Sequence, residues 1–99
     1  MKTLSDFAKE DYELSENGSV QQALVFLLNY HGVDHRDDVT IKWIRKFLDF
    51  AEKRLEDETM ELRRFRSPDW TWASLCGREG FVIVDKDGGV VDSYLYAMS

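Results

Sequence analysis

The stretch from Asp38 to Phe65 constrains the fold most, because its apolar residues recur at intervals of three and four. That spacing places them on one face of a helix. The members of this face are Ile44, Phe47, Leu48, Ala51, Leu55 and Leu62, and Trp43 and Phe50 widen it. The pattern predicts one long helix over residues 38–65. Its wide apolar face favours packing into a mixed core over the narrow seam of a coiled coil.

Two shorter helices are expected before this stretch. Thr3 and Asp6 have the spacing of a capping box and predict a short helix within residues 1–18. Ser19 and Gln22 repeat that spacing and predict a second helix over residues 19–31. The second helix is apolar on more than one side. We expect it to pack antiparallel to the long helix through the short link at residues 32–37.

After Pro68 the apolar period changes from that of a helix to that of a strand. Tryptophan and small residues alternate over residues 69–76, residues 77–80 resemble a turn, and residues 81–85 are a β-branched run. Asp87-Gly88-Gly89 indicates a hairpin, and residues 90–98 form the return strand. The chain is therefore predicted to be a single α+β domain over residues 1–99, with two or three helices packed on a C-terminal three-stranded antiparallel meander.

A two-residue turn at Asp87-Gly88 fixes the register of this hairpin. The predicted pairs are Phe81 with Tyr94, Val82 with Ser93, and Val84 with Val91. One face of the sheet then carries Val82, Val84, Val91 and Leu95, and the other carries Phe81, Ile83, Tyr94 and Tyr96. Both faces are apolar. Helices on one side alone would leave one of these faces uncovered.

Composition narrows the classes of partner. Hydrophobic residues make up 43% of the 99 residues, so a folded chain is expected. The net charge of −6 opposes binding to nucleic acid or to an anionic membrane and suits a protein partner with a basic surface. No stretch approaches the roughly 20 apolar residues of a membrane helix. Residues 1–7 lack the apolar run of a signal peptide, and Cys76 is a lone thiol, so a cytoplasmic location is expected.

Three patterns for catalysis or metal binding are weak. His31 and His35, with Asp34 or Asp38, have metal-ligand spacing, but Gly32 interrupts the helix that they would need. Cys76 lacks any motif of a nucleophile, and β-branched strands flank the acidic turn at residues 85–89 where a calcium loop needs helices. We therefore predict no catalytic residue, no metal site and no cofactor.

Two surfaces remain as candidates for binding. The first combines aromatic and arginine side chains, the types that dominate interface energetics: Trp70, Trp72, Phe81, Tyr94, Tyr96, Arg64 and Arg66. Its alternative is a core covered by helices, with arginine stems over the rings. The second is acidic: Asp49, Glu52, Glu56, Asp57 and Glu61. Because lysines and arginines are interleaved with these carboxylates, its alternative is an ordinary solvated helix face.

These features favour a small acidic non-enzymatic binding protein that occludes a surface of a protein partner. Inhibitors, immunity-type proteins and phage-type anti-defence factors, such as anti-CRISPR-like proteins, act in this way. The alternative is a homo-oligomeric structural or accessory protein, such as a homodimer, assembled through the sheet or through the edge strand at residues 90–98. We rank a small enzyme or a metal-binding protein below both.

Overall fold

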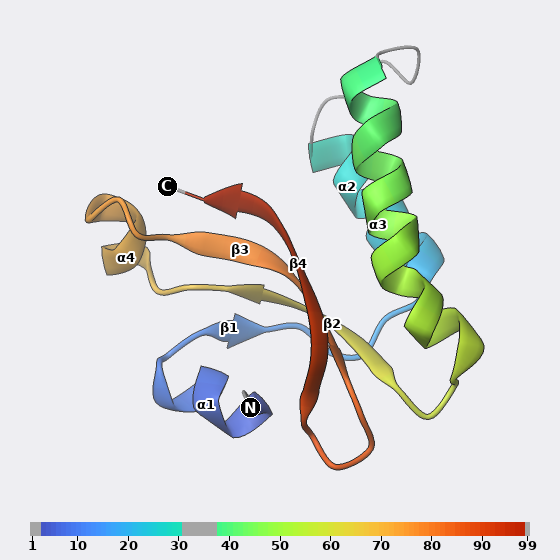
Figure 1. Cartoon of the computed structure of the whole chain (residues 1–99). Coiled ribbons are helices and arrows are strands. Elements are labelled where there is room, and N and C mark those ends of the chain that lie inside the picture. Colours follow the sequence, from blue (N-terminus) through green and yellow to red (C-terminus); the bar gives the residue numbers. More distant parts are fainter. Residues whose placement is uncertain (1–2, 31–37, 99) are drawn as a thin grey trace.

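The computed structural model describes residues 3–30 and 38–98 (Figure 1). Within these ranges the helices are α1 (Leu4–Lys9), α2 (Val20–Tyr30), α3 (Asp38–Glu56) and α4 (Asp69–Ala73). The strands are β1 (Glu13–Leu14), β2 (Glu61–Arg66), β3 (Arg78–Val84) and β4 (Val90–Met98). They form one antiparallel sheet in the order β1-β2-β3-β4. The predicted α+β class is confirmed. The three-stranded meander is wrong, because β1 and β2 join the sheet and residues 69–76 do not.

The predicted helix over residues 38–65 is wrong beyond Glu56, where α3 ends. The Asp57 carboxylate accepts hydrogen bonds from the backbone N–H and the hydroxyl of Thr59, at 2.9 and 2.6 Å. This local arrangement competes with continuation of the helix. Leu62 and Phe65 then lie on opposite faces of β2 and enter different cores. Residues three apart would share a face in a helix, so both fit the helical period without belonging to a helix.

The predicted strand over residues 69–76 is also wrong, because a short helix begins there. The Pro68 carbonyl accepts hydrogen bonds from the N–H and the hydroxyl of Thr71, which closes the first turn of α4. Asp69 in that turn suits the positive end of the helix dipole. A helix of five residues is too short to show a helical period, so the alternating tryptophans predicted a strand.

The predicted turn at residues 77–80 is wrong, because β3 already begins at Arg78. Gly80 lies inside this strand, where the pairing with β4 shifts by one residue. A Cβ atom on Gly80 would overlap the backbone oxygen of Tyr94. Glycine therefore permits the close approach of two strands at a bulge, not a turn.

The predicted hairpin is confirmed, with one change of register. The confirmed pairs are Phe81 with Tyr94 and Val82 with Ser93. Val84 pairs with Val90 instead of Val91, because the connection is longer than two residues. Its ends are joined by a hydrogen bond from the N–H of Asp85 to the carbonyl of Gly89, at 2.9 Å. The extra length shifts the register only next to the turn.

Both faces of the sheet are apolar, as predicted, and helices pack on each. The predicted place of Val91 is wrong: the register shift next to the turn packs it against the core on the Phe81 face, and Val90 packs with Val82 and Val84 instead. The larger core lies between the sheet and α2 with α3, and its buried members are Ala23, Leu27, Phe47, Phe50, Ala51, Leu62, Phe81 and Ile83. The smaller core lies under α1 on the opposite face, and its buried members are Phe7, Phe65, Val82 and Val84. Figure 1 shows α1 on one side of the sheet and α2 with α3 on the other. Helices on both faces therefore explain most of this apolar pattern, and Leu95, on the face under α1, stays 41% exposed.

The two predicted helix starts are confirmed. The Asp6 carboxylate accepts a hydrogen bond from the N–H of Thr3 at 2.9 Å. At the start of α2, the N–H of Ser19 donates to the Gln22 amide oxygen and the N–H of Gln22 donates to the Ser19 hydroxyl. Helices α2 and α3 contact each other and run in opposite directions (Figure 1). The predicted link at residues 32–37 and the helix end at His31 lie outside the described residues.

Candidate protein-binding surface

The end of the sheet next to α4 is built on a buried hydroxyl pair. The Ser67 and Thr71 hydroxyls lie 2.6 Å apart, and the Ser67 hydroxyl accepts a hydrogen bond from the N–H of Arg78 at 2.8 Å. The N–H of Ser67 in turn donates to the Arg78 carbonyl at 2.9 Å. Both hydroxyls are buried. These bonds fix α4 and the following turn to the start of β3.

Trp72 anchors α4 from the inside. Its indole ring lies against Gly77, and a Cβ atom there would overlap the ring. The guanidinium carbon of Arg66 lies 5.3 Å from the ring centroid, within the range of a cation–π contact. Arg66 also pairs with Asp69 at 2.6 Å and with Glu79 at 3.3 Å. The Asp69 carboxylate raises the pKa of Arg66, so this guanidinium stays charged over the tryptophan.

The outside of the same end carries large apolar side chains that are exposed. The three most exposed large hydrophobic side chains of the described residues are Leu75, Met98 and Trp70, at 79%, 68% and 65% exposure. Trp70 belongs to α4, Leu75 follows it, and Met98 pairs with Arg78 at the start of β3. All three therefore lie at one end of the sheet, where Figure 1 shows α4 and the end of β4. We call these three residues the apolar tip.

Leu75 holds an unusual backbone conformation in this tip. Its φ is 61°, in the left-handed region that a leucine rarely adopts. The N–H of Cys76 donates to the Thr71 carbonyl at 2.8 Å and closes the turn around it. A non-glycine residue in this region costs on the order of 1 kcal/mol. The leucine side chain gains little burial in return, since it points into solvent.

The predicted aromatic surface is divided between two places. Trp70, Trp72 and Arg66 lie at the α4 end, as described above. The remaining members lie on the face of β2, β3 and β4 that α2 and α3 cover: Arg64, Phe81, Tyr94 and Tyr96. Phe81 is only 4% exposed, whereas Tyr94 and Tyr96 are half-buried. The structure therefore brings the tryptophans together with Arg66, but it does not join them to the tyrosines as one exposed surface.

A ring cluster surrounds Tyr96. Its ring centroid lies 4.8 Å from that of Tyr30 and 5.6 Å from that of Phe26, both on α2. The guanidinium of Arg64 lies over the same Phe26 ring, 4.6 Å from its centroid. Burial raises the pKa of the Tyr96 phenol, and the neighbouring Glu79 carboxylate raises it further. This part of the predicted surface acts as packing between α2 and the sheet.

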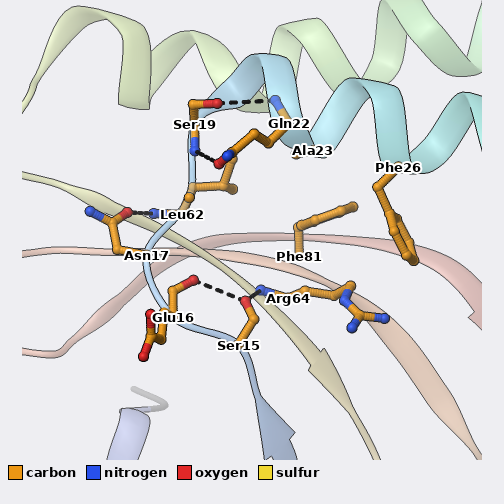
Figure 2. Close-up of a pocket in the computed structure, with 11 residues that line it drawn as sticks. Ser15, Glu16, Asn17, Ser19, Gln22, Ala23, Phe26, Leu62, Arg64 and Phe81 are labelled. Atoms are coloured by element: carbon orange, nitrogen blue, oxygen red, sulfur yellow. Dashed lines mark hydrogen bonds between the residues drawn. The ribbon is translucent and has the colours of Figure 1, made fainter.

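A groove of about 360 Å³ opens beside this cluster, between the start of α2 and β2 (Figure 2). Several of its polar groups are paired within the chain. The Ser15 hydroxyl accepts a hydrogen bond from the N–H of Arg64, and the Asn17 amide oxygen accepts one from the N–H of Leu62. Ser19 and Gln22 bond to each other, as the dashed lines in Figure 2 show. These bonds tie residues 15–19 to the sheet, which is a structural role.

The predicted acidic surface is not one row on a helix. Asp49, Glu52 and Glu56 are exposed on α3. Asp57 bonds to Thr59 in the turn after this helix, and those bonds lower the pKa of its carboxyl. Glu61 lies on β2 and pairs with Arg63 at 2.8 Å. Only the three carboxylates on α3 therefore share an element.

No metal cluster is found within residues 3–30 and 38–98, in the sense of three or more histidine, cysteine or acidic side chains gathered together. Cys76 is exposed beside the apolar tip. His31, His35 and Asp34 lie outside the described residues, as does the side chain of Asp38. That these residues bind no metal and assist no nucleophile therefore stays a prediction. No helix of the described part is long and apolar enough to span a membrane.

Two members of the apolar tip, Leu75 and Met98, are absent from the surface predicted from the sequence. Leu75 precedes Cys76 in a segment that the sequence predicts to be a strand, and alternate residues of such a strand face the core. Met98 ends a strand whose apolar residues were assigned to the sheet faces. Leu75 is exposed in the turn after α4, and Met98 is exposed at the end of the edge strand β4; neither has a sequence signal of its own. Comparisons of the chain with protein-family models, with curated proteins and with solved structures found no match.

Proposed function

We propose that this chain is a small binding protein that occludes a surface of a protein partner, with the apolar tip as its contact. The observation that carries this proposal is the gathering of Leu75, Met98 and Trp70, the most exposed large apolar side chains of the described residues, at one end of the sheet. Exposed apolar patches on small proteins mark interaction sites. Tryptophan in particular is enriched among the residues that dominate binding energy.

The support beneath the tip suits such a contact. Trp72, Arg66 and the Ser67–Thr71 hydroxyl pair fix α4, so its exposed residues are presented on a rigid base. A preorganised contact loses less conformational entropy when it binds. The strained Leu75 agrees with this view, because strain is retained in proteins mainly at functional sites.

The charge of the chain favours a basic partner. With a net charge of −6, long-range attraction would raise the rate of encounter with a basic surface. Inhibitors, immunity-type proteins and phage-type anti-defence factors are the classes of protein that act through this kind of occlusion. We propose a cytoplasmic location and a non-enzymatic mode of action for the same protein.

Affinity capture from the cells that encode the chain, followed by mass spectrometry, tests this proposal. The test compares the unchanged chain with the variant Trp70→Ser/Leu75→Asn. A matched control is Val25→Ser, which removes another exposed apolar side chain, on α2. We expect a protein that the unchanged chain and the control both capture and that the tip variant loses. Capture of the same proteins by the tip variant would overturn the proposal.

A further inference from the structure

A second exposed apolar feature runs along α3. Ile41, Leu48 and Leu55 are 37%, 40% and 61% exposed, and they are spaced seven residues apart. Seven residues are close to two helical turns, so the three side chains form one stripe about 21 Å long at 1.5 Å per residue. Leu48 and Leu55 were expected in the core, and the structure places them outside it. We call these three residues the α3 stripe.

The core of the domain lies along a different side of α3. Phe47, Phe50 and Ala51 are buried there against α2 and the sheet. In Figure 1, α2 crosses behind α3, and no other helix or strand of the described residues lies in front of α3. None of the three residues of the α3 stripe therefore belongs to the core, although all three are large and aliphatic.

The charged residues next to the stripe form a self-complementary pattern. Arg45 and Glu52 are both exposed and lie three and four residues on either side of Leu48. Ile41 and Leu55 lie seven residues on either side of the same leucine. If a second α3 runs antiparallel with Leu48 facing Leu48, each Ile41 faces a Leu55 of the other copy. Each Arg45 then lies within one residue, about 1.5 Å along the axis, of the level of a Glu52 of the other copy. A parallel pair would place like charges opposite each other.

We propose that the α3 stripe binds a second copy of this chain, as a two-fold antiparallel pair of α3 helices centred on Leu48. A two-fold contact uses the same patch on both subunits, which is what a self-complementary stripe provides. Helix α3 carries five basic and four acidic residues, so the net charge of −6 on the whole chain is not concentrated at the contact. This pairing is independent of the apolar tip, which lies on α4 and the end of β4.

Sedimentation equilibrium over roughly 1 µM to 1 mM protein measures the dissociation constant of the dimer. Leu48→Glu places two like charges at the centre of the contact, and we expect the constant to rise by about 100-fold. Circular dichroism checks that this variant keeps its fold, which its exposed position favours. The control Trp70→Ser, at the tip, is expected to leave the constant within about twofold.

A charge swap tests the direction of the pair. Arg45→Glu turns both intersubunit pairs repulsive and is expected to raise the constant by about tenfold. Arg45→Glu/Glu52→Arg restores both pairs and is expected to return the constant to within about threefold of the unchanged chain. A chain that stays monomeric at about 1 mM overturns the proposal. A dimer that Leu48→Glu leaves intact also overturns it and would point to the sheet or its edge strand. A double swap that does not restore the dissociation constant overturns it as well.

Discussion

The indole ring of Trp72 packs directly against Gly77, and a Cβ atom on Gly77 would overlap this ring. Gly77 sits directly before β3, and Trp72 lies near the end of α4. The lack of a side chain at Gly77 therefore lets α4, the helix that carries Trp70, pack against the start of β3. The apolar tip depends on this contact for its position on the sheet.

Gly77→Ala is expected to lower the free energy of unfolding by about 1–3 kcal/mol, because the new methyl group must displace the ring or the backbone. Urea unfolding followed by circular dichroism measures this change. The control is Gly18→Ala, where an added Cβ meets only an ordinary contact with Gln22, and an effect within about 0.5 kcal/mol is expected. Equal effects at the two glycines would contradict the contact.

The two tryptophans of α4 should differ in their effect on stability. Trp70→Ala removes an exposed ring and is expected to change the free energy of unfolding by no more than about 0.5 kcal/mol. Trp72→Ala removes the anchor between Gly77 and Arg66 and is expected to cost about 2–3 kcal/mol. Trp72→Phe should cost less, since the indole N–H has no hydrogen-bond partner among the described residues. Similar losses for Trp70→Ala and Trp72→Ala would show that both rings belong to the core.

Leu75→Asn should stabilise the chain by about 1 kcal/mol, because asparagine adopts the left-handed conformation more readily than leucine. Little burial is lost with the exposed side chain. Thermal unfolding measures the gain. The neighbouring Ser74 has a φ of −92°, so Ser74→Asn should give no comparable gain. A destabilised Leu75→Asn would mean that the leucine packs on the protein.

Tyr96 makes stability depend on alkaline pH. Burial raises the pKa of its phenol in the folded chain above the ordinary value, so the folded state favours the neutral form. This contribution to stability is fully present below about pH 10 and is lost as the pH rises above the ordinary tyrosine pKa of about 10. The free energy of unfolding should therefore fall less steeply for Tyr96→Phe than for the unchanged chain between about pH 9 and 11. Parallel slopes in urea unfolding would contradict this assignment.

The C-terminal hairpin was predictable because its turn residues and its β-branched run both indicate two strands joined by a short turn. The register of Phe81 with Tyr94 follows from that agreement. The error at β2 has a physical cause: Leu62 and Phe65 are three residues apart, which fits one helix face as well as two faces of a strand with a core on each side. The turn before them contains no glycine or proline, and its stop signal is the carboxylate of Asp57 bonding to Thr59.

The candidate site was predictable only in part. Trp70, Trp72 and Arg66 were singled out as binding residues by type, and the structure brings them to one end of the sheet. Their companions in that prediction, Tyr94 and Tyr96, lie under α2 and α3, because helices on both faces cover the sheet. The exposure of Leu75 depends on one backbone angle after a five-residue helix, which residue types do not encode.

The apolar tip is the proposed contact with a protein partner. Its most direct test is the dissociation constant between the purified chain and the partner obtained by capture, measured by calorimetry. Trp70→Ala is expected to raise this constant by at least about tenfold, while the control Val25→Ser leaves it within about twofold. An unchanged constant for Trp70→Ala, in a variant that keeps its fold, would contradict the account.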